Sequence, residues 1–241
     1  MTHVRVILPA YAPKACNMQM LKQYETPELT ISLTYGEVEA TSARSEIEMH
    51  LLSNTTIKKI IEAQNEGVDA IVINIMAEFS LSPMLEVASV PLVTLPKIAF
   101  NTASMLSDKF TIVSTTPSVY AMQTRLIQKY GLTDRFASFR CVSFLPEYDY
   151  DAPENIEALL DVCVKAIEED HAGAIIFGSG RVVGITEPIK QALLKKGYDI
   201  PLIEALPLGI KYAKLLADLK LKQSKIDYPL PSVDVTQLLG L

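Results

Sequence analysis

Cysteine and histidine are scarce in this sequence, which has three of each among its 241 residues. The cysteines are odd in number and form no Cys-x-x-Cys pair, so they supply no disulfide framework and indicate a reducing cytoplasm. Long apolar runs are also absent, because residues 70–76 and 172–177 fall well short of the ~18 residues that a membrane span needs. Residues 4–8 are apolar but interrupted by Arg5, a pattern that predicts a strand and not a signal peptide.

Basic residues are outnumbered, since 22 Lys and Arg face 28 Asp and Glu, and the net charge is −6. This acidic balance argues against a nucleic-acid partner and against binding to an anionic membrane. Apolar residues make up 49% of the chain, which excludes disorder and is enough for a real core. The length fits either one large α/β domain or two smaller lobes.

Short aliphatic runs alternate with helical patterns along the chain. Most runs are continuous, as expected of strands buried on both faces of a parallel sheet. The helical patterns between them end at glycines such as Gly67, Gly131 and Gly197. This alternation predicts a doubly wound α/β architecture. We expect strands at residues 4–8, 29–33, 70–75, 92–95, 110–114, 136–144, 174–177 and 202–204.

The chain also repeats itself. Ala70-Ile-Val-Ile-Asn-Ile-Met matches Ala174-Ile-Ile-Phe-Gly-Ser-Gly, and Val90-Pro-Leu-Val matches Ile200-Pro-Leu-Ile. Such a repeat predicts two similar parallel-sheet lobes related by a pseudo-two-fold axis, with a cleft between them. We place the first lobe at residues 1–97 plus 206–241 and the second at residues 98–205.

Ligands of open α/β sheets bind beyond the carboxyl ends of the strands. The repeat puts Ile75 and Ser179 at equivalent strand ends, so we expect them on opposite walls of the cleft. The candidate site is therefore built from the residues that follow four strands, namely 9–11, 75–78, 115–116 and 179–181.

Five fragments in a fixed order carry a family resemblance: Gly67-Val-Asp-Ala-Ile-Val-Ile, Val90-Pro-Leu-Val, Gly173-Ala-Ile-Ile-Phe-Gly-Ser-Gly, Ile200-Pro-Leu-Ile and Tyr228-Pro-Leu-Pro. With them the chain resembles the aspartate/glutamate racemase superfamily, and within it the hydantoin racemase branch. The resemblance covers nearly the whole chain. It implies a homodimer or larger homo-oligomer without a cofactor or metal, in which two facing cysteines exchange a proton next to a carbonyl.

The sequence departs from that family at both cysteine positions, which are Ile75 and Ser179 here. Isoleucine carries no proton, and an unassisted serine hydroxyl is too weak a base, so the resemblance implies the fold without the two-thiol mechanism. Helical spacing favours a core role for Cys163, and a strand pattern favours a core or edge role for Cys141. Cys16, after the first strand, stays open as a reactive thiol.

Four residues are candidates for the catalytic groups. Glu78, Lys97 and Tyr11 are placed to move a proton, and Ser179 is placed to hydrogen-bond a substrate oxygen. Three of them also have a structural interpretation: a helix-start acid for Glu78, a surface lysine for Lys97 and a turn residue for Ser179. The three histidines precede strands or lie on a helix, which argues against a Ser–His–Asp hydrolase.

The candidate substrate-binding residues follow the same strands. Arg181 has the guanidinium that clamps a carboxylate, although an arginine at a helix start is more often solvated. The other candidates supply hydroxyls, backbone amides, an apolar wall or an orienting carboxylate: Ile75, Thr115, Thr116, Gly178, Gly180 and Glu204.

We therefore expect a cytoplasmic, cofactor-independent enzyme that acts at the carbon next to a carbonyl of a small carboxylate or amide, as a racemase or isomerase. The alternatives are a lyase or decarboxylase on the same scaffold, and an inactive protein that binds the same small molecules. The apolar tail at residues 232–241 predicts docking on the chain's own surface or on a neighbouring subunit.

Overall fold

The computed structural model describes residues 1–39, 45–143, 152–178 and 184–240. It divides into two compact units, one of Met1–Leu95 with Gly209–Leu241 and the other of Pro96–Leu208. Among the described residues, no helix is both long and apolar enough to cross a membrane.

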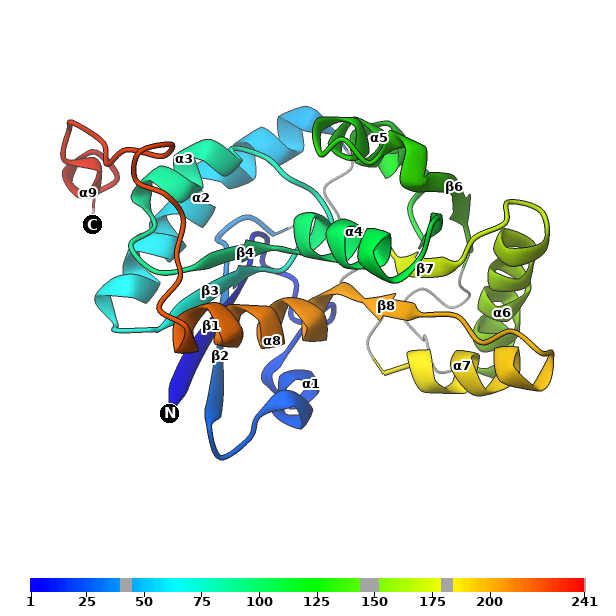
Figure 1. The fold of residues 1–241 in the computed structure, drawn as a ribbon. Helices are drawn as coiled ribbons and strands as arrows, with labels where there is room; N and C mark the ends of the chain where they lie inside the picture. The colour runs from blue at the N-terminus through cyan, green and yellow to red at the C-terminus, as the bar shows by residue number, and fades with distance from the viewer. Residues whose placement is uncertain (40–44, 144–151, 179–183, 241) are drawn as a thin grey trace. The chain divides into compact units, whose positions relative to one another are not determined.

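The first unit is built on a parallel sheet with the strand order β2-β1-β3-β4. The strands are β1 (Thr2–Leu8), β2 (Leu29–Tyr35), β3 (Ala70–Ile73) and β4 (Leu92–Thr94). All four residues of β3 are buried, which explains why its sequence is apolar without alternation. In Figure 1, helices α2 (Glu46–Asn65) and α3 (Leu81–Val87) lie on one side of this sheet, and α8 (Ala205–Asp218) lies on the other.

Short-range chemistry explains the ends of α2. The Ser45 side chain accepts from the Glu48 backbone N–H, and the Glu48 carboxylate accepts from the Ser45 backbone N–H, which together form a capping box. The chain leaves the helix at Gly67, whose φ of +82° is readily adopted only by glycine. The buried face of α2 packs with α3 and with Ile7, Ile71 and Ile73 of the sheet in one apolar cluster.

Helix α8 packs closely on the opposite face of the sheet at Gly209. A Cβ atom there would lie 2.9 Å from Leu95 Cδ2 and 3.4 Å from Val72 Cγ1. The absence of a side chain at this position therefore lets the helix backbone approach β3 and β4. Two short helices, α1 (Met18–Leu21) and η1 (Lys22–Tyr24), join β1 to β2.

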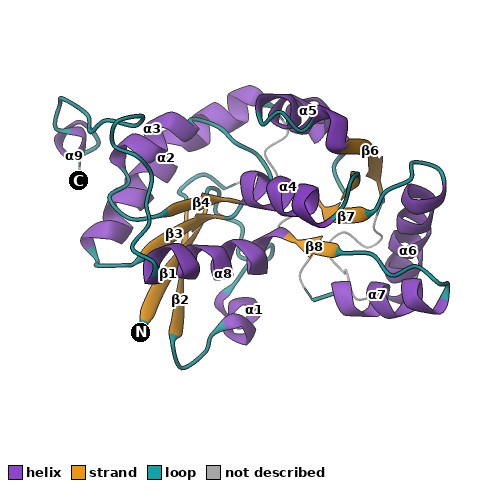
Figure 2. Ribbon diagram, in the orientation of Figure 1, coloured by secondary structure: helices purple, strands orange, loops and turns teal. Residues whose placement is uncertain are grey.

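The second unit repeats this plan with the strand order β6-β5-β7-β8. Its strands are β5 (Phe110–Ser114), β6 (Phe136–Cys141), β7 (Ala174–Phe177) and β8 (Leu202–Glu204). As Figure 2 shows, helices surround the strands, and these are α4 (Leu95–Leu106), η2 (Pro117–Val119), α5 (Tyr120–Lys129), η3 (Thr133–Arg135), α6 (Pro153–Glu168) and α7 (Thr186–Lys195). The two equivalent parallel sheets confirm the predicted α/β fold and the internal repeat.

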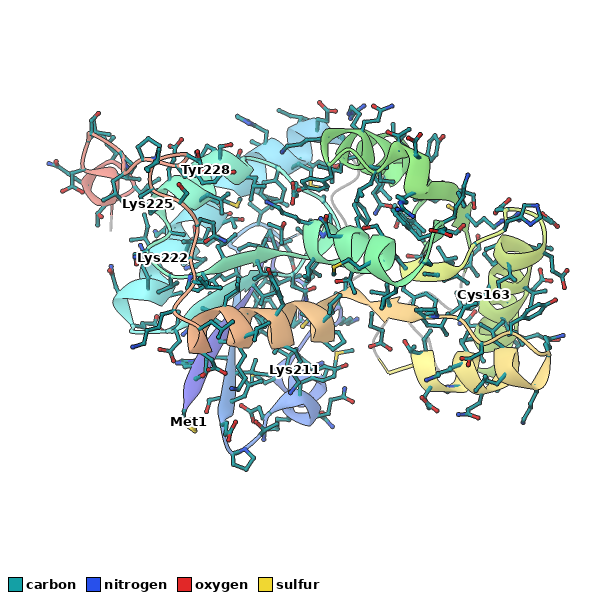
Figure 3. All side chains as sticks on the ribbon, viewed as in Figure 1. Met1, Cys163, Lys211, Lys222, Lys225 and Tyr228 are labelled. Atoms are coloured by element: carbon teal, nitrogen blue, oxygen red, sulfur yellow. The ribbon has the colours of Figure 1, made fainter. Side chains whose placement is uncertain are left out.

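The segment after α8 lies against α3 and β4 of the first unit, as the labelled residues of Figure 3 indicate. The Gln223 side chain donates to Leu92 O at 2.7 Å and accepts from Leu92 N at 3.1 Å. Lys225 Nζ donates to Leu85 O and Glu86 O at the end of α3, both at 2.8 Å. Tyr228 packs against the α2–α3 cluster. These contacts hold residues 223–228 on the unit.

The chain continues beyond Tyr228 into a last short helix, α9 (Val235–Leu238). Val233 is 58% exposed and Leu238 is 74% exposed. The predicted docking of this tail on its own chain is therefore wrong for these two side chains, because the described residues leave most of their surface uncovered. Docking on a neighbouring subunit stays a prediction.

Two predicted strands end two or three residues earlier than expected. The strand expected at residues 70–75 ends at Ile73, because Asn74 and Ile75 leave the strand for the loop. The strand expected at 136–144 ends at Cys141.

Candidate functional site

The residues after β3 form the centre of the candidate site in the first unit. The Asn74 backbone N–H donates to Ile7 O at 2.8 Å and so extends the ladder by one residue, whereas Ile75 N donates back to Ile73 O at 3.0 Å. The half-buried Ile75 side chain packs against the α2–α3 cluster. Isoleucine at this position therefore adds apolar contact to the core and supplies no group that exchanges a proton.

Glu78 follows three residues later and is held by the neighbouring strand. Thr94, the last residue of β4, donates its hydroxyl to Glu78 Oε1 at 2.5 Å. Both side chains lie at the carboxyl edge of the sheet, where ligands of α/β proteins bind. The hydrogen bond fixes one carboxylate oxygen in place, as proton transfer to a positioned substrate requires.

Asn74 is a polar residue that the sequence reasoning missed. It is 2% exposed, and within the described residues its Oδ1 has no hydrogen-bond partner. The Asn74 side chain is hydrogen-bonded to the thiol of Cys16, which is also 2% exposed. An unsatisfied buried carbonyl costs about 1–3 kcal/mol, so this oxygen is a notable feature of the strand end.

Burial also determines the chemistry of Cys16. It raises the pKa of the thiol to about 11, and the hydrogen bond from Asn74 offsets only part of this rise. Cys16 is therefore a protonated thiol at neutral pH, unlike the activated thiolates of reactive cysteines. The hypothesis of a reactive Cys16 thus lacks the lowered pKa that it requires.

Two tyrosines lie beside Cys16. Tyr35 Oη donates to Cys16 O at 2.7 Å, and the Tyr11 ring meets the Tyr35 ring edge-on with 5.5 Å between centroids. Burial raises the pKa of Tyr35, and the nearby Cys16 and Tyr11 raise it further. Tyr11 is 48% exposed, so this group of side chains extends from the buried Asn74 to solvent.

In the second unit, Gly178 follows β7 at the position that corresponds to Asn74. Its N–H donates to Val113 O at 2.7 Å, and a Cβ atom would lie only 2.7 Å from Ile112 Cγ2. Glycine therefore permits β7 to approach β5 at the strand end. Thr115 and Thr116 follow β5, and both are half-buried. The Thr116 backbone N–H donates to Ser114 Oγ at 3.2 Å.

Glu204 ends β8 and holds the start of α7. Its Oε1 accepts from Gly184 N at 3.2 Å, from Thr186 N at 3.3 Å and from the Thr186 hydroxyl. A carboxylate at this position satisfies N–H groups that the first turn of a helix leaves unpaired. The observed contacts give Glu204 a structural role at the start of α7, and an orienting role toward a substrate stays a prediction.

Three of the remaining candidates, Ser179, Gly180 and Arg181, lie outside the described residues. Lys97 is exposed on α4, and its Nζ lies 5.9 Å from the centroid of the Tyr130 ring. Tyr130 is the residue that follows α5, so Lys97 has an aromatic neighbour in the second unit.

The other two cysteines belong to the second unit, one to its core and one to its edge strand. Cys163 is fully buried in the cluster of α6 and α7, and burial raises the pKa of its thiol to about 12. Cys141 is exposed at the end of the edge strand β6. Among the described residues, no group of three or more His, Cys, Asp or Glu side chains is arranged to hold a metal ion.

Sequence reasoning missed Asn74, Tyr35 and Thr94. Asn74 had a usable signal, since it is the one polar residue in the run Ala70-Ile-Val-Ile-Asn-Ile-Met. Thr94 and Tyr35 had none, because a threonine or a tyrosine at a strand end is common and their partners come from distant parts of the chain.

Comparisons with known proteins agree with this architecture. The curated hydantoin racemase of Pseudomonas sp. (strain NS671) is 29% identical over 171 residues, which cover 70% of this chain and 67% of the relative. The solved allantoin racemase of Klebsiella pneumoniae matches with a TM-score of 0.87 at 21% identity, covering 97% of this chain and 95% of that one. A double mutant of arylmalonate decarboxylase matches with a TM-score of 0.68 at 14% identity, over 90% and 93% of the two chains.

The likeness to the solved structures shows a shared fold, and the family match goes further. The model of the family described as Asp/Glu/Hydantoin racemase matches residues 19–213, which include every strand from β2 to β8 and the candidate residues from Ile75 to Glu204. The sequence fragments, the two equivalent sheets and this match agree, and the chain belongs to the Asp/Glu/hydantoin racemase family of enzymes.

Proposed function

We propose that this enzyme exchanges the proton on a carbon next to a carbonyl of a small cyclic or open-chain amide, without a cofactor. The observation that carries the proposal is the Glu78 carboxylate, fixed by Thr94 at the carboxyl edge of the first sheet. The family membership supports the reaction class, and the hydantoin and allantoin racemases among the similar proteins support an amide substrate.

In this mechanism Glu78 takes the α-proton as a general base. The electron pair of the broken C–H bond moves into the carbonyl and forms an enolate, which backbone and side-chain donors stabilise. Protonated Glu78 then returns the proton. A single base exchanges the proton on one face, so inversion requires a second donor, and Tyr11 is our candidate for it.

The substrate oxygens need donors on the other side of the reacting carbon. We assign this role to Ser179, Arg181 and the hydroxyls of Thr115 and Thr116, with the backbone N–H group of Gly180. The N–H of Gly178, which the sequence also suggests as a donor, is already used because it donates to Val113 O. Ile75 supplies an apolar wall, and Glu204 orients the start of α7. The division into lobes at residues 1–97 plus 206–241 and 98–205 belongs to the same proposal, as does a homodimeric or larger assembly.

The test is a turnover assay on a panel of single-enantiomer 5-substituted hydantoins, allantoin and amino acids, with chiral chromatography as the readout. We expect interconversion of at least one amide substrate and a loss of roughly 100-fold or more in Glu78→Gln. Glu154→Gln is the matched control, since Glu154 is an exposed acid on α6. Full activity of Glu78→Gln would contradict the assignment of the base.

A lyase or decarboxylase is the second candidate. The observation in its favour is that neither Ile75 nor Ser179 carries a thiol, while the fold resembles that of arylmalonate decarboxylase. Loss of CO₂ needs a stabilised carbanion and one proton donor and does not need two opposed bases. Release of CO₂ from phenylmalonate, with no interconversion of hydantoin enantiomers, would favour this candidate. Specific binding of a panel compound without turnover of any would favour an inactive binding protein.

A further inference from the structure

The proton transfer proposed above does not use the Asn74 side chain, although Asn74 lies at the end of the central strand β3. The residue is 2% exposed, and within the described residues its Oδ1 accepts no hydrogen bond. A carbonyl oxygen is an acceptor with two lone pairs, so this position offers an unused, buried acceptor.

The direction of the side chain follows from the alternation along β3. Ile71 and Ile73 belong to the apolar cluster with α2 and α3, whereas Val72 packs on the other face near Gly209 of α8. Because side chains alternate along a strand, Asn74 shares the face of Val72 and lies one step beyond it, at the carboxyl edge. That edge is where ligands of open α/β sheets bind.

The contact with Cys16 indicates which atom of the Asn74 amide, Nδ2 or Oδ1, has no partner. The side chains of Asn74 and Cys16 are hydrogen-bonded, and since Oδ1 has no partner, the amide makes this bond through Nδ2. Cys16 is itself anchored, because its carbonyl oxygen accepts from Tyr35 Oη at 2.7 Å. The amide is therefore held by its nitrogen, while its oxygen is a buried acceptor with no partner among the described residues.

We propose that Asn74 determines substrate specificity by accepting a hydrogen bond from an amide N–H of the substrate. This inference rests on the proposed function and narrows its substrate class. An acceptor oxygen favours a ring or ureido N–H and disfavours a second carboxylate, whose oxygens carry only lone pairs. Asn74 thus selects amides over dicarboxylates at the same site.

The test measures binding by calorimetry, with 5-benzylhydantoin and its 1-methyl and 3-methyl derivatives as probes. Methylation replaces one N–H at a time, so we expect one derivative to bind wild-type protein about tenfold or more weakly than the parent compound. Asn74→Leu should weaken binding of the parent to a similar extent and should abolish the difference between parent and methyl derivative. Asn101→Leu, in α4, is the control and should bind like wild type.

The outcomes of this experiment separate the two proposals. If wild-type protein binds the parent and both methyl derivatives equally, the inference about Asn74 is wrong and the proposed function survives. The inference is also wrong if Asn74→Leu folds and still prefers the parent by the same factor, because the preference of the wild-type protein then does not come from Asn74 Oδ1. If neither hydantoin nor allantoin binds wild-type protein, the proposed function is wrong and this inference with it. If Asn74→Leu does not fold, the comparison of the parent compound with its methyl derivatives on wild-type protein still tests the inference about Asn74.

Discussion

Thr94 and Glu204 occupy equivalent positions at the ends of the last strands of the two sheets. Thr94 pairs with Ile73, and Glu204 pairs with Phe177, at the same place in each ladder. Each side chain holds a residue that follows the neighbouring strand: Thr94 donates to Glu78, and Glu204 accepts from Thr186. Both units therefore have a hydroxyl–carboxylate hydrogen bond at this place. In the first unit the strand carries the hydroxyl, and in the second unit the strand carries the carboxylate.

The Thr94–Glu78 hydrogen bond predicts a positioning role for Thr94. Thr94→Val keeps the shape of the side chain and removes the donor, so we expect kcat to fall about tenfold because one carboxylate oxygen loses its fixed orientation. Thr94→Ser retains the hydroxyl and should retain activity to within a few-fold. Equal losses of activity in the two variants would point to packing at β4 and not to the hydrogen bond.

The Glu204–Thr186 contact predicts a coupling in stability. Glu204→Gln and Thr186→Val each remove part of the interaction that satisfies the start of α7, and each should lower the free energy of unfolding by ~1 kcal/mol. Because both changes break the same contact, the double variant should lose less than the sum of the two. Urea denaturation of the four proteins measures this, and strictly additive losses would show that the two side chains act independently.

The pattern of hydrophobic residues was enough to predict the fold. Continuous apolar runs such as Ala70–Ile73 identified buried parallel strands, and the repeat between this run and the one at Ala174 identified the second sheet. Each run is recognised from neighbouring residues of the chain, and the repeat needs only a comparison of two such runs.

The contacts of the site could not be predicted in the same way. Asn74 is hydrogen-bonded to Cys16, which lies 58 positions earlier in the chain (74 − 16). No local sequence pattern predicts such a pairing. Strand periodicity located Glu204 at the end of β8, and it placed Glu78 at the end of a strand that in fact ends five residues earlier, at Ile73. It gave no indication of the threonine partners of these two residues. The neighbour of Lys97 was equally hidden, since its ammonium lies near the ring of Tyr130, 33 positions further along the chain (130 − 97).

The two buried thiols predict a pH dependence of stability. Burial raises the pKa of Cys16 to about 11 and that of Cys163 to about 12, from an ordinary value of 9.0. Above pH 9 the unfolded chain loses these protons while the folded chain keeps them, so stability falls as pH rises. Each thiol should contribute a loss of ~1 kcal/mol by pH 10.

Thermal unfolding of wild type and Cys163→Ala between pH 7 and pH 10 measures this effect. The variant is less stable at neutral pH, because it leaves a small cavity, but its stability should decline less steeply above pH 9. Parallel curves for the two proteins would show that Cys163 does not titrate differently in the folded and unfolded states.

The exposed tail predicts an assembly contact. Val233 and Leu238 expose apolar surface beyond residues 223–228, which are anchored on the first unit. We expect truncation after Pro231 to lower the mass measured by light scattering, because the tail docks on a neighbouring subunit. An unchanged mass together with an unchanged melting temperature would contradict this.

The central claim is that a carboxylate, and no thiol, moves the α-proton. The most direct measurement is the rate of deuterium incorporation at C5 of 5-benzylhydantoin in D₂O, followed by proton NMR. The decisive protein is a cysteine-free variant, Cys16→Ser with Cys141→Ser and Cys163→Ala, because alkylation does not reach buried thiols. We predict exchange within about tenfold of wild type in this variant, and a loss of roughly 100-fold or more when Glu78→Gln is added. Exchange that disappears with the cysteines and survives Glu78→Gln would contradict the account.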